Sequence, residues 1–269
     1  HTYQGLSAGL DFEARLFAKP DMARMLEKEI TRPGYEPKPI AIGTNTDPYQ
    51  PIEKEWQVMR GVLEVLEQYN HPVMITTKGA MIQRDIDILA RMAEKGLATV
   101  AISLTTMDRR LARTMEPRAS TPTKRLETIR ALASAGIPTH VLVAPIIPGL
   151  NDHEIEKILD AAAAQGALGA SHVLLRLPLE VAPIFKEWLL RHYPERYRHV
   201  LSLVRSMRGG KDYDANWSAR MKGTGPYAWQ ISRRMQLASK RLGLGARTRH
   251  LRTDLFTGGK AHGEQLALL

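Results

Sequence analysis

The chain has 269 residues, and 43% of them are hydrophobic, which is enough for one substantial core in an α/β barrel or a smaller barrel with a helical extension. It contains no cysteine, which excludes disulfides, thiolate nucleophiles and thiolate metal sites for these residues. No apolar run approaches the roughly 20 residues of a membrane span, and the amino terminus lacks a signal-peptide pattern. We therefore expect a cytoplasmic protein with no membrane partner.

The net charge of +10 is concentrated near the carboxyl terminus. Between residues 205 and 252, twelve lysines and arginines stand against two aspartates, a surplus of ten, so the rest of the chain is neutral overall. Such a segment is typical of a contact with DNA or RNA, in which Arg233, Arg234, Lys240 and Arg241 would follow the phosphates. A solvated helix face followed by a loose basic tail explains the charge at least as well.

Five short runs rich in Val, Ile and Leu follow a predicted helix over residues 21–30. These predicted strands are 39–43, 73–76, 98–103, 139–145 and 172–177. Amphipathic helices are predicted between them over 53–69, 84–95, 122–135 and 152–165. This alternation is typical of a parallel sheet with right-handed crossovers. The strand-to-helix loops are the long ones, and a barrel carries its chemistry on such loops.

The alternation ends at residue 178. Helices are predicted over 181–192, 195–207 and 226–242, and the residues from 244 onward have the composition of a flexible tail. The predicted organisation is therefore a barrel over 1–178, a helical extension over 179–243 and a flexible basic tail over 244–269. Because the chain starts with His1 in what resembles a loop, we expect it to be a fragment.

Side chains that could bind a ligand or take part in a reaction follow the predicted strands. In chain order they are Asn45, Thr46 and Asp47, then Lys78, then Ser103, then the proline-stiffened run 145–152, then Arg176. The carboxyl ends of parallel strands meet at one edge of a sheet, so this set would suit a zwitterionic ligand that carries an apolar ring.

Each of these features has a simpler explanation when taken alone. Asn and Asp before proline are ordinary turn formers, Lys78 can be a surface lysine, and Arg176 can be paired with an acid. Glu116 and Arg118 are expected to form an ion pair that stiffens the loop after the third strand. The histidines lack the spacing of a metal site, and no catalytic triad, phosphate loop or dinucleotide fingerprint is present.

Several short motifs together carry a resemblance to a known family. They are GTNTDPYQPIE at 43–53, TTK at 76–78, RD at 84–85, IS at 102–103, EPR at 116–118, APIIPGLND at 144–152 and LRLP at 175–178. From His1 to about Gly243 the chain resembles radical SAM proteins of an uncharacterised bacterial group related to spore photoproduct lyase, often described as DNA-repair photolyase-like. The resemblance implies a partial (β/α)6 TIM-like barrel with a C-terminal helical extension. Its first strand and cluster loop would lie upstream of His1.

The resemblance also implies cofactors and a reaction. In that family a CxxxCxxC motif ligates a [4Fe–4S] cluster, and this motif would precede the segment that matches residues 1–7. The intact protein would cleave S-adenosylmethionine to a 5′-deoxyadenosyl radical that abstracts hydrogen, with an external electron donor and nucleic acid as the leading substrate class. The chain by itself would be inactive, and its catalytic residues remain unassigned.

Residue roles follow from the same resemblance. Asn45, Thr46 and Asp47 would lie near the methionine amino group, Lys78 would pair with the methionine carboxylate, and Ser103 would bind near the ribose or carboxylate. Ile146 and Ile147, with neighbouring backbone, would pack the adenine. Two alternatives stay open: a cluster-less barrel that binds nucleic acid or a partner protein, and an ordinary barrel enzyme that acts on an anionic metabolite through Lys78 and Arg176.

Overall fold

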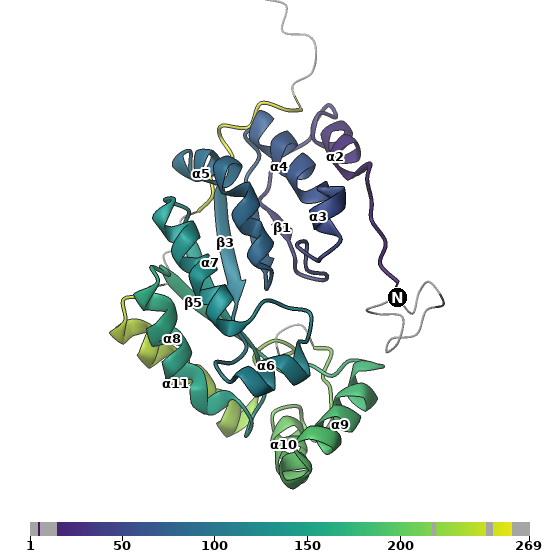
Figure 1. The fold of residues 1–269 in the computed structure, drawn as a ribbon, viewed down its shortest axis with the longest axis vertical. Coiled ribbons are helices and arrows are strands. Elements are labelled where there is room, and N and C mark those ends of the chain that lie inside the picture. The colour runs from purple at the N-terminus through teal and green to yellow at the C-terminus, as the bar shows by residue number, and fades with distance from the viewer. Residues whose placement is uncertain (1–4, 6–14, 217–218, 246–249, 260–269) are drawn as a thin grey trace, which may run out of the picture.

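The computed structural model describes residue 5 and residues 15–216, 219–245 and 250–259. Within these ranges a five-stranded parallel sheet has its strands in sequence order (Figure 1). They are β1 (Ile40–Ile42), β2 (Val73–Thr77), β3 (Ala98–Ser103), β4 (Thr139–Ile146) and β5 (Gly169–Leu174). A parallel sheet whose order never reverses is the arrangement of a barrel, since a doubly wound sheet changes direction. The predicted partial α/β barrel is confirmed.

Helices cover one face of this sheet (Figure 1). They are α2 (Met22–Ile30), α3 (Glu53–Trp56), α4 (Val58–Gln68), α5 (Ile86–Glu94), α7 (Pro122–Ser134), α8 (Ile155–Ala164) and α11 (Gly225–Arg241), with 3-10 turns η2 (Ala80–Asp85) and η3 (Asp152–Glu154). Strand residues alternate accordingly: Val73 and Ile75 are buried under the helices, whereas Met74 is 41% exposed on the other face. None of the described helices has the length and apolar composition of a membrane span.

A second, smaller core lies beyond the carboxyl ends of the strands. It joins α6 (Arg109–Met115) to α9 (Val181–His192) and α10 (Tyr197–Ser206), which are linked by η4 (Pro194–Arg196). Its buried side chains include Leu111, Ile147, Leu177, Phe185, Leu189 and Val204. By contrast, α11 returns to the main core through Ala228, Ile231 and Met235. The loop after β3, which carries α6, therefore connects the barrel to α9 and α10.

Strand β5 begins and ends three residues earlier than the predicted 172–177. The apolar run continues past the sheet because Leu175 and Leu177 pack into the second core instead. At the start of the strand Gly169 pairs with His140 of β4, and a Cβ at Gly169 would lie 2.4 Å from the imidazole Nδ1 of His140. Packing of the His140 ring, rather than strand propensity, therefore favours glycine at this end.

The carboxyl-terminal segment 250–259 is not a loose tail, which corrects the prediction for these residues. Arg252 N donates to Gly96 O at 3.0 Å, and Thr257 N donates to Tyr69 O at 3.0 Å. The Phe256 ring packs edge-on against His71 with centroids 5.3 Å apart. Since Tyr69 and Gly96 precede β2 and β3, the segment crosses the amino-terminal ends of the strands. Figure 1 shows it in yellow near α5.

Substituting Gly43, at the end of β1, should destabilise the fold more than the loss of glycine flexibility alone. Gly43 has φ +87°, and a Cβ there would lie 1.9 Å from Thr76 O. Gly136 has φ +76° with no atom within 4 Å of the place that a Cβ would take, which makes it the matched control. We expect Gly136→Ala to cost about 1–2 kcal/mol and Gly43→Ala at least about 2 kcal/mol more in urea unfolding. Equal losses would contradict the close approach.

Candidate functional site

Asp47 fastens the loop after β1 to the end of β2. Its Oδ1 accepts hydrogen bonds from Tyr49 N at 2.9 Å and Thr77 Oγ1 at 2.6 Å, and its Oδ2 accepts one from Lys78 N at 2.7 Å. Both carboxylate oxygens are therefore engaged within the protein. In this structure Asp47 fixes where Lys78 leaves the strand, whereas its predicted place beside a methionine amino group stays a prediction.

A network of ion pairs and hydrogen bonds holds the loop after β1 through Tyr49 and Glu53. Tyr49 Oη donates to Asp85 Oδ2 at 3.1 Å, and the guanidinium of Arg84 donates to both oxygens of Asp85 at 2.9 Å. Arg84 also donates to Glu53 Oε1 at 2.9 Å. Burial first, and then the charge of Asp85, raise the pKa of Tyr49 well above its usual value, so Tyr49 stays a neutral donor. Tyr49 and Glu53 of the first motif therefore form one network with Arg84 and Asp85 of the RD motif.

Lys78 lies at the rim of the sheet in an ion pair with Glu116, which sequence reasoning did not assign to the site. Lys78 Nζ is 2.5 Å from Glu116 Oε1, and the side chains are 33% and 9% exposed. Glu116 Oε2 accepts from Arg125 Nη2 at 2.7 Å. Burial raises the pKa of Glu116, but the charges of Lys78 and Arg125 outweigh it, and the net pKa lies below its ordinary value. The site thus contains an ionised carboxylate between two cations.

The hydroxyl of Ser103 points into the sheet. Ser103 is 4% exposed, and its Oγ donates to Ala144 O at 3.1 Å. Its backbone oxygen accepts from Arg125 Nη1 at 3.0 Å. Thr105 Oγ1 lies 2.9 Å from both Glu116 Oε1 and Ala144 O. Ser103 therefore joins β3 to β4 beside Glu116 and Arg125, and the structure has its hydroxyl already bonded.

Ile146 and Ile147 are buried by the protein itself. Their side chains are 1% and 0% exposed, Ile146 in the main core and Ile147 in the second. Asn151 shapes the run: its Oδ1 accepts from Ile147 N at 2.6 Å, and its Nδ2 donates to Thr105 O and Pro145 O at 2.8 and 3.0 Å. Backbone and the half-buried Pro145, rather than the isoleucine side chains, are what this run can offer to a flat ring.

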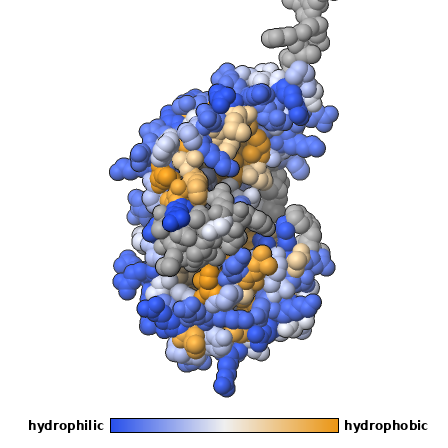
Figure 2. Space-filling view, turned by 90° about the vertical axis from the view of Figure 1, so that its right-hand side faces the viewer, coloured by the Kyte–Doolittle hydropathy of each residue, from blue (hydrophilic) through white to orange (hydrophobic). Residues whose placement is uncertain are grey.

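Asn45 and Thr46 are exposed on the loop after β1. Thr46 and Asp47 line a groove of about 620 Å³ beside the edge strand, together with apolar side chains such as Phe17, Trp56 and Met59. Figure 2 faces the side on which β1, α2 and α3 lie in Figure 1, and it shows apolar surface set within a largely hydrophilic face. Thr46 thus borders an apolar groove, and Asn45 precedes it on the same exposed loop.

Arg176 contacts Tyr213 rather than Lys78. Its Nη2 is 3.3 Å from Tyr213 Oη, and its guanidinium carbon lies 5.9 Å from the centroid of the Tyr213 ring. The structure therefore gathers Asp47, Lys78 and Ser103 with Glu116, while Arg176 binds the segment before α11. Because β5 ends at Leu174, Arg176 lies two residues beyond the strand.

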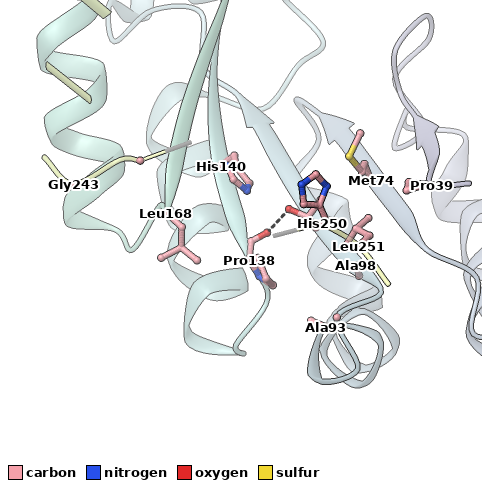
Figure 3. Close-up of a pocket in the computed structure, with 13 residues that line it drawn as sticks. Pro39, Met74, Ala93, Ala98, Pro138, His140, Leu168, Gly243, His250 and Leu251 are labelled. Carbon is pink, nitrogen blue, oxygen red and sulfur yellow. Dashed lines mark hydrogen bonds between the residues drawn. The ribbon is translucent and has the colours of Figure 1, made fainter. Parts of the chain in front are cut away.

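Another cavity, of about 560 Å³, lies at the amino-terminal ends of the strands (Figure 3). It is lined by Met74, Pro138, His140 and Leu168, with Leu251 of the carboxyl-terminal segment. None of the predicted site residues lines it. A barrel carries its chemistry at the opposite end, so this cavity is not the candidate site.

Among the described residues, no group of three or more His, Cys, Asp or Glu could hold a metal ion. The side chains at the carboxyl ends form a polar, cationic rim. It combines one partly exposed ammonium, a buried carboxylate and a buried guanidinium with a stiff apolar run.

The sequence profile of the radical SAM superfamily matches residues 14–162, which is more than half of the chain. The chain belongs to the radical SAM superfamily. An uncharacterised protein of Mycobacterium tuberculosis is 36% identical over 205 residues, which cover 74% of this chain and 60% of that protein. One from Methanocaldococcus jannaschii is 26% identical over 161 residues, covering 60% and 59%. This radical SAM chain thus spans about 60% of the length of these relatives.

Solved structures of spore photoproduct lyase share the fold. One mutant of that enzyme superposes with a TM-score of 0.55 at 16% identity, covering 84% of this chain and 64% of that chain. Another, described with bound AdoMet and dinucleoside spore photoproduct, has a TM-score of 0.51 at 16% identity, covering 82% and 63%. The predicted radical SAM membership is confirmed, and the barrel is similar to that of spore photoproduct lyase.

Membership of the radical SAM superfamily implies S-adenosylmethionine and a [4Fe–4S] cluster. The rim fits the carboxylate of the methionine moiety, because an ammonium has three donors and Lys78 can keep Glu116 while it binds a second carboxylate. Cluster irons are held by cysteine thiolates, and these 269 residues include none. They therefore do not fit as ligands of the cluster.

Replacing Glu116 with glutamine should destabilise the fold in a pH-dependent way. The pKa of Glu116 is depressed in the folded state, so its contribution is present above about pH 4.3, the unfolded value, and is lost as pH falls through the folded pKa. We expect Glu116→Gln to lower the free energy of unfolding by about 2–3 kcal/mol at pH 7, and this gap to narrow below about pH 4. Urea unfolding from pH 3 to 7 measures it.

Glu127 provides the matched control, because its ion pair with Lys124 is solvent-exposed. Glu127→Gln should change the free energy of unfolding by less than about 0.5 kcal/mol across the same range. A gap for Glu116→Gln that stays constant down to pH 3 would contradict the depressed pKa.

Proposed function

We propose that the whole protein is a radical SAM enzyme and that the rim at the carboxyl ends of β1 to β4 binds S-adenosylmethionine. One observation carries this proposal. The superfamily match over residues 14–162 includes β1 to β4, and the segments that follow the first three of these strands meet at Asp47, Lys78 and Glu116. These residues offer a cation for a carboxylate beside a stiff apolar run.

The residues of this chain bind and orient the cofactor. Lys78 would direct its free N–H groups at the methionine carboxylate, while Glu116, itself held by Arg125, keeps the ammonium in place. The backbone around Pro145, which Asn151 shapes, would pack against the adenine. When bound and cleaved by one electron, S-adenosylmethionine supplies a 5′-deoxyadenosyl radical that takes hydrogen from a substrate.

For the whole protein we propose that cysteines outside these residues ligate the cluster and that an external donor supplies the electron. The relatives, of which this chain spans about 60%, support a longer protein. The full-length protein, reconstituted with iron and sulfide and then reduced, should convert S-adenosylmethionine to 5′-deoxyadenosine, measured by chromatography. A full-length protein that binds no iron would instead favour a binding module, or a barrel enzyme that acts on an anionic metabolite.

The proposed substrate class is nucleic acid, and the proposed reaction is lyase-like or related, within DNA repair. Two observations support it. The fold is similar to that of spore photoproduct lyase, one structure of which is described as complexed with dinucleoside spore photoproduct. The chain also concentrates its excess of ten positive charges between residues 205 and 252.

Removing the ammonium of Lys78 should weaken cofactor binding. We expect Lys78→Ala to raise the dissociation constant for S-adenosylmethionine about tenfold or more, because one charge-assisted hydrogen bond is lost. Lys95→Ala is the control, since Lys95 binds Asn70 at an exposed position near the other end of the strands. Titration calorimetry on full-length protein measures both. Equal affinities for wild type and Lys78→Ala would remove Lys78 from the site.

A further inference from the structure

A groove of about 940 Å³ runs between α11 and β5. Its floor is formed by strand residues 170–172 and by Met235 and Leu244. Its polar wall carries Lys222, Arg233, Lys240 and the indole of Trp229. Among the described residues that line the groove, none is acidic. It therefore combines positive charge and an aromatic ring with a few apolar side chains, among them Met235 and Leu244.

The helical repeat places these side chains in one row. Residues 229, 233, 236 and 240 follow one another at steps of four, three and four, so they share one face of α11. Trp229 and Arg233 are about 6 Å apart along the axis, and Trp229 and Lys240 about 16 Å. Trp229 is 69% exposed, so its ring is available to a ligand. A neighbouring face, with Ala228, Ile231 and Met235, is buried in the core.

The structure divides the cations of α11 into two groups. Arg234 and Arg241 form ion pairs with Glu156 and Asp160, at 2.5 and 2.8 Å, so their charge is used to join α11 to α8. Arg233 Nη1 contacts the neutral amide of Gln236 and leaves the other donors of its guanidinium available. Within the described ranges Lys222 and Lys240 form no ion pair, so the groove keeps a net positive charge.

We propose that this groove binds single-stranded nucleic acid. Trp229 stacks on an unpaired base, and Lys222, Arg233 and Lys240 contact the phosphates on either side of it. The groove lies beside β5 at the margin of the barrel sheet, where α11 and α8 lie together in Figure 1. The inference rests on the proposed nucleic-acid substrate and names the surface and the strand state that it requires.

An exposed aromatic ring among cations selects single strands over the alternatives. In a duplex the bases stack on one another, so an indole beside the groove has no free base to meet. An acidic protein would use the cations but would gain little from Trp229. Loss of the Trp229 ring should therefore weaken binding of single-stranded nucleic acid only, whereas loss of the cations should weaken binding of any polyanion.

The experiment uses full-length protein and a fluorescein-labelled dT oligonucleotide, with binding measured by anisotropy across a salt titration. Trp229→Ala should weaken binding of the oligonucleotide about tenfold, the size of one base–aromatic stack. It should leave binding of polyglutamate, a polyanion without bases, unchanged. The double variant Arg233→Gln/Lys240→Gln should reduce the slope of log affinity against log salt by about 1.4.

Matched controls come from the same chain. Trp56→Ala removes a 47% exposed indole elsewhere and should leave the affinity for the oligonucleotide unchanged. Arg241→Gln removes a cation that is paired with Asp160, and it should change the salt slope by less than half as much as the double variant. Circular dichroism melting of each variant shows that it is folded.

The outcomes are separate from those of the cofactor experiment, because binding needs neither cluster nor S-adenosylmethionine. If Trp229→Ala binds the oligonucleotide with wild-type affinity, or if the wild-type protein does not bind it, the proposed binding to this groove is wrong, even if 5′-deoxyadenosine is formed. Duplex or polyglutamate that binds as tightly as the single strand would assign the groove to that ligand instead. Oligonucleotide binding without 5′-deoxyadenosine would overturn the radical SAM proposal and leave the groove standing.

Discussion

The carboxylate of Glu116 is the interaction on which the candidate site depends. It joins Lys78 at the end of β2, Thr105 after β3 and Arg125 on α7, and so connects three elements at one point. A buried ion pair contributes little net stability, because desolvation of the charges offsets their attraction. Its value here is positional: it fixes an ammonium at the rim. Asp47 acts on the same lysine from the other side, through the backbone N–H.

Asp47 binds the backbone N–H of Lys78, and Glu116 binds its side-chain ammonium. Asp47 holds the loop after β1 against β2, and Gly43 allows the close approach to Thr76 that this requires. Glu116 belongs to the loop after β3, which also carries α6 and joins the second core. The packing of α9 and α10 therefore bears on the loop that positions Lys78. Barrel, extension and rim form one continuous set of contacts.

Much of the fold could be predicted from the sequence, since short apolar runs and amphipathic repeats fix four of the strands to within one residue. Helix α6 was missed because its seven residues include three arginines and only Leu111 and Ala112 are buried. The burial of Ile146 and Ile147 within the protein could not be predicted from the sequence pattern, and their contact with the adenine stays a prediction. The pairing of β4 with β5 shifts register between Val143 and Ile146, so simple alternation no longer says which side chain faces the rim.

The candidate site was predictable only in part. The strand ends brought Asp47, Lys78 and Ser103 to one edge, but the partner of Lys78 lies 38 residues further along, where no local pattern indicates it. The basic segment is a similar case. Its charge could be counted, whereas the acids that neutralise Arg234 and Arg241 lie on α8, 78 and 81 residues earlier. Pairing between distant segments is a property of the fold.

The segment 250–259 has a consequence for how this protein is made. It hydrogen-bonds to Tyr69 and Gly96, and Phe256 packs on Tyr35 and His71, so residues far apart in the sequence are neighbours. Contacts of such long sequence separation close large loops and slow the search for the native state. During synthesis the amino-terminal helices and strands leave the ribosome well before their last neighbour does. Until then, Tyr35 and His71 lack the ring that packs against them in the folded protein.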